Sequence, residues 1–135
     1  MVCSFSHERV FNPSLSRITV FKEDKLGFDY PITCRQCSVC PPIDFCTATA
    51  LRKKEGVIKV DKRLCVGCGT CVEYCNYGAV KLNVEGKPLI CDLCGGKPEC
   101  VSRCPTGALE YLNVEEFSET LDEAKQKLCK IWGIE

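Results

Sequence analysis

Cysteine is the residue type with the most chemical potential in this chain, because 14 of its 135 residues are cysteines and one is a histidine. Most of the cysteines fall into three groups with short spacings. The groups are Cys34, Cys37, Cys40 and Cys46; Cys65, Cys68, Cys71 and Cys75; and Cys91, Cys94, Cys100 and Cys104. Cys3 and Cys129 lie apart from them. Thiolates grouped in this way are typical ligands of a metal centre.

The rest of the composition favours metal over disulfides. The N-terminus has no charged segment followed by an apolar one, and no apolar run approaches the roughly 18 residues of a membrane span. We therefore expect a cytoplasmic protein without membrane insertion, where thiols stay reduced. The 18 basic and 18 acidic residues balance, which argues against a nucleic-acid partner.

The second group has the spacing CxxCxxCxxxC, which is specific for iron–sulfur chemistry. Three thiolates two residues apart wrap one [4Fe–4S] cluster, and the fourth cysteine ligates the other cluster of a two-cluster pair. Gly67 and Gly69 suit this loop, because residues without a Cβ let the backbone come close to inorganic sulfur. Structural zinc sites also use CxxC pairs, so a zinc-binding interaction module remains a remote alternative.

The same crossover predicts the ligands of three sites, which we name A, B and C. Site A is Cys34, Cys37, Cys40 and Cys75; site B is Cys65, Cys68, Cys71 and Cys46; site C is Cys91, Cys94, Cys100 and Cys3. Cys104 is left as an orphan ligand, and Cys129 is expected to be a small buried hydrophobe. The sets predict three clusters and about 12 iron atoms, or about 16 if a segment upstream of Met1 supplies a fourth set.

Other residues are placed around these cysteines. Alternating stretches predict strands over 17–21, 57–60, 79–84 and 108–112, in a repeat of strand, cysteine loop, short helix and strand. Apolar residues spaced by three and four predict a C-terminal amphipathic helix from Asn113 to Gly133, which packs on its own domain or docks on another subunit. His7, Arg35, Gln36 and Lys97 either tune a cluster or are solvated.

The stretches CSFSHERVFNPSLSRITV, CRQC, CVGCGTCVEYC and CDLCGGKPECVSRCPTGAL carry a family resemblance over about residues 2–112. The chain resembles the iron–sulfur subunits of molybdenum and tungsten oxidoreductases, formate dehydrogenases and hydrogenases, and particularly the polyferredoxin partners of tungsten aldehyde oxidoreductases. In that family the first group is complete, whereas here only Cys3 is present. Cys40 precedes the proline pair instead of following it, and Cys46 and Cys75 lack a following proline.

The resemblance implies an α+β fold with two ferredoxin-like lobes around the clusters. Residues 1–30 and 85–112 would form a first, incomplete lobe, residues 31–84 a second, two-cluster lobe, and residues 113–135 the C-terminal helix.

No paired carboxylates, phosphate loop or nucleophile set accompanies the cysteine loops, so we expect no enzyme activity from the chain alone. The expected function is an electron-transfer subunit between a catalytic oxidoreductase subunit, tungsten aldehyde oxidoreductase-like by resemblance, and a ferredoxin or another carrier subunit. A free-standing soluble polyferredoxin is the alternative. The partner's substrate, the direction of electron flow and the cluster potentials are not determined by these residues.

Overall fold

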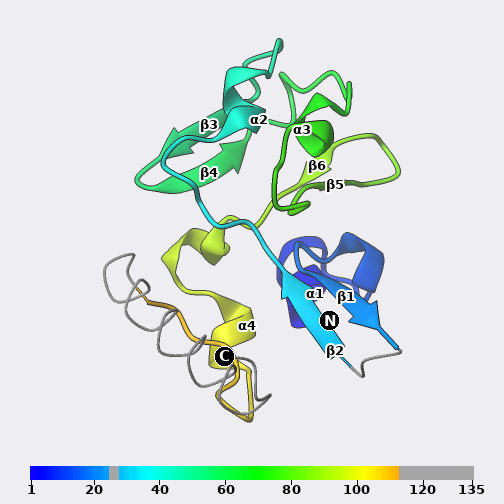
Figure 1. Cartoon of the computed structure of the whole chain (residues 1–135), viewed down its shortest axis with the longest axis vertical. Helices are drawn as coiled ribbons and strands as arrows, with labels where there is room; N and C mark the ends of the chain where they lie inside the picture. The colour runs from blue at the N-terminus through cyan, green and yellow to red at the C-terminus, as the bar shows by residue number, and fades with distance from the viewer. Residues whose placement is uncertain (25–27, 113–135) are drawn as a thin grey trace, which may run out of the picture. The chain divides into compact units, whose positions relative to one another are not determined.

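The computed structural model describes residues 1–24 and 28–112. In this part the chain is a small α+β protein of short helices and two-stranded sheets (Figure 1). The helices are α1 (Val2–Glu8), α2 (Pro41–Asp44), α3 (Thr70–Glu73) and α4 (Glu99–Ser102), with 3₁₀ turns η1 (Pro13–Leu15) and η2 (Leu93–Gly96). The strands are β1 (Thr19–Glu23), β2 (Phe28–Ile32), β3 (Leu51–Lys54), β4 (Val57–Val60), β5 (Lys81–Leu82) and β6 (Pro88–Leu89).

Two compact units make up the chain, Met1–Arg103 and Cys104–Glu135. The first unit contains every helix and strand named above. The second is described only as far as residue 112, so the predicted helix over 113–135 and Cys129 lie outside the described residues. No helix in the described part has the length and apolarity needed to cross a membrane.

All strands pair as antiparallel hairpins, β1 with β2, β3 with β4 and β5 with β6. The tightest is β3–β4, where Lys54 pairs with Val57 and the two turn residues, Glu55 and Gly56, have φ of 53° and 77°. Two positive φ values define the type I′ turn, whose twist matches that of the strands. The predicted strand over 57–60 is confirmed as β4.

The other three predicted strands agree less well with the structure. The one over 17–21 is shifted to β1, and the one over 79–84 shrinks to β5. The prediction over 108–112 is wrong, because these residues form no strand in the described part. Alternation alone does not make a strand: its N–H and C=O groups need a neighbouring strand to bond with.

The buried core of the first unit is small and partly made of sulfur. One cluster within it consists of Leu51, Ile58, Cys71, Val80 and Ile90, and the other buried apolar residues are Cys3, Ala50, Ala79 and Leu89. Further cysteines pack against it half-buried, namely Cys34, Cys40, Cys46 and Cys75. The hairpin β3–β4 and the short helices thus share one core with the thiols of two cysteine groups.

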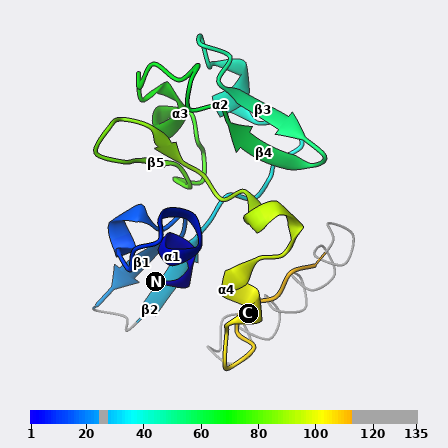
Figure 2. The same ribbon diagram turned by 180° about the vertical axis from the view of Figure 1, so that it is seen from behind.

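Two pairs of helices bring the cysteine groups together. Helix α2 contacts α3, and both views of the ribbon show them as neighbours (Figures 1 and 2). At their ends Phe45 and Tyr74 stack with ring centroids 4.0 Å apart and planes 19° apart. Helix α1 contacts α4. Helices of four residues are too short to be stable alone, so these contacts must hold them.

Candidate metal centres

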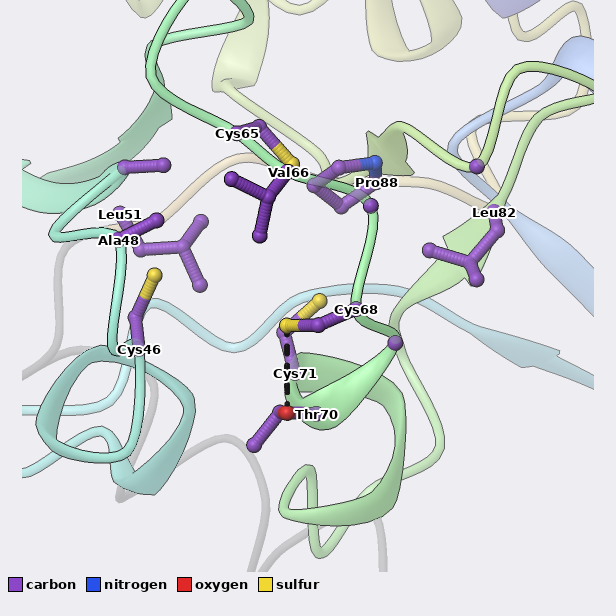
Figure 3. Close-up of a pocket in the computed structure, with 14 residues that line it drawn as sticks. Cys46, Ala48, Leu51, Cys65, Val66, Cys68, Thr70, Cys71, Leu82 and Pro88 are labelled. Carbon is purple, nitrogen blue, oxygen red and sulfur yellow. Dashed lines mark hydrogen bonds between the residues drawn. The ribbon is translucent and has the colours of Figure 1, made fainter.

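Site B is a hollow lined by all four of its predicted cysteines, Cys46, Cys65, Cys68 and Cys71 (Figure 3). The hollow measures about 370 Å³, including space open to solvent. Its other walls are mainly apolar or glycine, among them Ala48, Leu51, Val66, Leu82 and Pro88. Cys46 comes from the loop after α2, Cys65 and Cys68 come from the loop that leads into α3, and Cys71 lies on α3 itself. Two segments of the chain therefore converge here.

The thiols of site B interact electrostatically. Burial is the main cause that raises the pKa of Cys71, and the neighbouring Cys65, Cys68 and Cys46 raise that pKa further. Thr70 has the opposite effect on Cys68: its Oγ1 donates a hydrogen bond to Cys68 Sγ over 3.2 Å and lowers the pKa of that exposed thiol. Crowded thiols of this kind repel each other as thiolates unless a cation lies among them.

Glycine is required where the loop of site B approaches the β5–β6 turn. Gly67 has φ of 75°, and a Cβ on it would lie 3.3 Å from the carbonyl oxygen of Gly86. Gly69, with φ of 79°, caps the start of α3. Across the same contact Lys87 Nζ donates to the carbonyl oxygen of Cys65. The contact at Gly67 therefore fastens the cysteine loop to the hairpin, a role that the sequence did not predict. The predicted approach of the two glycines to inorganic sulfur stays a prediction.

The four predicted cysteines of site A lie near one another. Burial raises the pKa of Cys34 to about 11; the backbone N–H of Gln36 opposes this, and the nearby Cys40 and Cys37 add to it. Burial likewise raises the pKa of Cys40, which also has Cys37 and Cys75 as neighbours. The sequence left Cys40 in doubt because it precedes the proline pair, yet the structure places its thiol with the other three.

Site C brings Cys3 to the third cysteine group across most of the sequence. Burial is the first cause that raises the pKa of Cys94 and of Cys100, and both thiols have Cys3 and Cys91 among the neighbours that raise the pKa further. Cys3 itself is 8% exposed, on α1. The contact between α1 and α4 therefore puts the isolated cysteine beside Cys100, which lies on α4.

The surroundings of site C are polar and buried. The backbone N–H of Arg17 donates to Cys3 Sγ over 3.2 Å. The Arg17 side chain is 9% exposed; its Nη2 donates to Glu8 over 3.4 Å, while its Nη1 is buried without a hydrogen-bond partner in the part of the chain described. A buried cation with a free donor fits a site that receives negative charge.

His7 ties this site together from α1. Its Nδ1 lies 2.9 Å from the carbonyl oxygen of Cys3, and its Nε2 lies 2.9 Å from Asp92 Oδ1. Asp92 Oδ1 also accepts from the backbone N–H of Cys94 over 3.1 Å. Ligand atoms of His7, Asp92 and Cys94 lie within 4.8 Å of one another. Because the histidine and the carboxylate are hydrogen-bonded to each other, we interpret them as residues that hold α1 against the third cysteine group, and not as metal ligands.

The remaining cysteine in the described part is Cys104, in the second unit. Its Sγ lies 3.6 Å from the Thr106 hydroxyl, and hydrogen bonds with Thr106 and with the Leu109 N–H lower the pKa of this thiol. Cys104 is half-buried, as most cysteines of sites A and C are, but the pKa of its thiol shifts downward whereas burial raises the pKa of Cys34 and Cys100.

The three sites fit [4Fe–4S] clusters on their own geometry. Every cysteine in the described ranges is free, and each site has four thiols in mutual proximity. Donors already point at sulfur, as Thr70 does in site B, Arg17 in site C, and the N–H of Ala79 on Cys75 over 3.4 Å in site A. Donors to sulfur are the groups that tune and hold such clusters.

Several residues of these sites could not be identified from the sequence. Lys87 and Asp92 gave no signal, and Gln36, His7 and Arg35 were noted only as loop or terminal residues with two interpretations. Their partners are 22 to 85 residues away along the chain for Lys87, Gln36 and His7. Arg35 stacks over the ring of Tyr77, 4.6 Å from its centroid.

Comparison with known proteins agrees with this chemistry. Residues 57–80, which include the site B loop, match the family model described as a 4Fe-4S binding domain. The polyferredoxin-like subunit of the aliphatic sulfonate oxidoreductase of Pyrococcus furiosus is 37% identical over 117 residues, which are 84% of this chain and 67% of that protein.

Two further relatives cover shorter parts. An uncharacterized ferredoxin of Methanocaldococcus jannaschii is 34% identical over 76% of this chain and 60% of its own length. The thiosulfate reductase electron transfer subunit PhsB of Salmonella typhi is 34% identical over 63% of this chain and 49% of its own length. The chain thus spans between about half and two thirds of the length of these three relatives.

The match to the 4Fe-4S binding domain and the grouped free cysteines of the described residues define an iron–sulfur protein of the ferredoxin type. Within that class, the chain belongs to the family of polyferredoxin-like [4Fe–4S] electron-transfer subunits.

Proposed function

We propose that the chain is the electron-transfer subunit of an oxidoreductase complex and holds three [4Fe–4S] clusters, at sites A, B and C. The observation that carries this proposal is the convergence of three sets of four thiols within the unit Met1–Arg103. The clusters would supply one-electron acceptors and donors. No group of acid–base or nucleophilic residues accompanies them in the described part that would add a reaction of the chain's own.

The chain's residues would bind, shield and orient these clusters. The cysteines of each site come from two segments, so ligation would join those segments. Apolar side chains such as Val66 and Leu82 line site B and would cover one side of a bound cluster. Burial and N–H donors to sulfur affect how stable the negative charge of the thiolates is. Both are means by which a protein tunes the reduction potential of a cluster.

We further propose a catalytic partner of the tungsten aldehyde oxidoreductase type, with a ferredoxin or another carrier subunit as the second partner. Support comes from the sequence resemblance and from the Pyrococcus furiosus relative, which is the subunit of an aliphatic sulfonate oxidoreductase. Both lines concern enzymes that pass electrons to or from an iron–sulfur subunit.

The test is an analysis of the native protein from anaerobic cells. We expect about 12 iron and 12 acid-labile sulfide per chain, no stoichiometric zinc, and a large redox subunit that co-purifies. Zinc without iron would exclude the iron–sulfur function. A monodisperse iron-loaded monomer without a large partner would instead support a free-standing soluble polyferredoxin.

A further inference from the structure

Gln36 connects site A with site C through its side-chain amide. Its Nε2 donates to the carbonyl oxygen of Cys91 over 2.6 Å, across 55 residues of sequence. Its Oε1 accepts from the backbone N–H of Ile58 on β4 over 2.7 Å. Both ends of the amide are therefore bonded to backbone groups. A half-buried side chain satisfied at both ends has a defined position, unlike a solvated one.

The backbone of Gln36 belongs to site A. Its N–H donates to Cys34 and counteracts the rise in the pKa of that thiol. Its carbonyl oxygen accepts from Lys53 Nζ over 2.9 Å, and the same ammonium bonds the carbonyl oxygen of Cys37 over 2.8 Å. One residue thus touches Cys34 with its main chain and Cys91 with its side chain.

The conformation of Gln36 is unusual for its type. Its φ is 52°, in the left-handed region that residues other than Gly, Asn and Asp seldom adopt. Strained backbone persists where surrounding contacts hold it, and it is concentrated at functional sites. Here the side-chain amide is held by its bonds to the backbone groups of Cys91 and Ile58.

A thiol of site C is also near enough to site A for an electrostatic interaction. Cys91, a predicted ligand of site C, is the thiol with the largest effect among those that raise the pKa of Cys34. The Gln36 side chain therefore lies where the two sites approach each other, and it offers a continuous route of covalent and hydrogen bonds from Cys34 to Cys91.

We propose that Gln36 is a positioning residue that fixes the ligand loop of site A against the ligand loop of site C and sets the contact between their clusters. This rests on the proposed ligand sets. The amide keeps Cys34 and Cys91 at a fixed separation, and through them the two clusters. Without it, the loops stay ligated at each site but their distance varies.

The test compares the iron-loaded full chain with three variants. Gln36→Leu removes both amide bonds. Gln36→Glu keeps the acceptor for Ile58 and loses the donor to Cys91. Lys53→Met is the matched control, because it removes the ammonium from the same loop and leaves the amide bridge intact. Iron and sulfide content are measured first, followed by electron paramagnetic resonance of the fully reduced protein, whose line shape reports magnetic interaction between neighbouring clusters.

We expect wild-type iron content in all variants, and a severalfold loss of the interaction broadening in Gln36→Leu and Gln36→Glu but not in Lys53→Met. Unchanged spectra in both Gln36 variants overturn the inference and leave the proposed function intact. Equal narrowing in Lys53→Met also overturns it, because any loosening of the loop would then suffice.

Three other outcomes are informative. Retention of the broadening in Gln36→Glu contradicts the inference, because the bond to Ile58 would then be enough. If both Gln36 variants lose iron, the side chain serves cluster retention and the bridge is refuted. A wild-type chain without clusters refutes the proposed function, and this inference falls with it.

Discussion

The thiol of Cys3 is isolated along the sequence and buried in the fold. It is one turn from His7, whose ring binds Asp92 beside Cys94, and it accepts the N–H of Arg17. Its position in the sequence, next to residue 2 and far from the other cysteines, gives no indication that it is a ligand. The shared proximity to Cys94 and Cys100 makes Cys3 the residue on which the number of clusters depends.

We predict that Cys3→Ala lowers the iron content of the purified chain by about four atoms, because three thiolates leave a [4Fe–4S] cluster without its fourth ligand. The matched control is Cys104→Ala, which removes a thiol outside the three predicted sets and should leave iron unchanged. Iron and sulfide assays on both variants decide the matter. Equal iron in the Cys3 variant and the wild type would show that site C is completed by another ligand.

Gly67 offers a second prediction. An alanine there would take a left-handed φ, which costs about 1–2 kcal/mol, and its Cβ would press on the Gly86 carbonyl oxygen 3.3 Å away. Gly56→Ala is the control, since φ there is 77° but nothing lies within 4 Å. We expect Gly67→Ala to lower the melting temperature of the loaded protein more than Gly56→Ala does. Similar losses would mean that the loop yields to the new methyl group.

At the residue scale the sequence predicts which cysteines group together better than it predicts which residues hydrogen-bond around them. Spacings of two and three residues restrict where a cysteine loop can go, so the grouping of Cys65, Cys68 and Cys71 could be anticipated. The hydrogen bonds of Gln36 and His7 could not, because they span 55 and 85 residues and depend on how separate loops pack. A single sequence holds no local pattern for such contacts.

Among the elements, the β3–β4 hairpin carries a residue that is poorly suited to its place. Glu55 occupies the first position of the type I′ turn with φ of 53°, where Asn is the preferred residue. We predict that Glu55→Asn raises the free energy of unfolding by about 1 kcal/mol, since Asn tolerates the left-handed region.

The measurement for this change is thermal denaturation of the loaded protein. Glu55→Ala is the comparison, because it removes the same charge without relieving the backbone, and it should leave the stability near that of wild type. If Ala stabilises as much as Asn, the gain comes from charge and not from the turn.

Element prediction succeeded where a local rule and a partner coincided. Strand β4 follows the Glu55–Gly56 turn and pairs with β3. The alternation from Val57 to Val60 predicted its position in the sequence. Residues 108–112 alternate as well, yet no described strand pairs with them, so the same pattern gave a wrong result. Sheet formation depends on a neighbour that the alternating segment itself does not specify.

On the scale of the whole molecule, we expect the first unit to depend on its proposed metal sites for stability. Its hydrophobic cluster has five buried members, one of them a cysteine, and α2, α3 and α4 each span four residues. Neither feature supports independent folding, so metal bound at these sites would contribute folding free energy directly.

We therefore predict that removing iron with ferricyanide and a chelator abolishes the cooperative thermal transition and the helical circular dichroism of the chain. Reconstitution with iron and sulfide should restore both, whereas zinc should restore neither fully. An iron-free chain that still melts cooperatively would show that the aliphatic core is sufficient, and would weaken the argument that the thiols are part of it.

The stacked rings of Phe45 and Tyr74 immediately precede Cys46 and Cys75, the two cysteines proposed to exchange between sites A and B. The half that contains α2 would thus supply Cys46 to site B, and the half that contains α3 would supply Cys75 to site A, next to the aromatic contact between the two halves. In dissection experiments neither half would therefore act as a module, since either fragment would keep three thiols for its own site and one with no use. During maturation the two clusters would likewise be inserted together, because neither site has all four of its ligands until both halves have folded against each other.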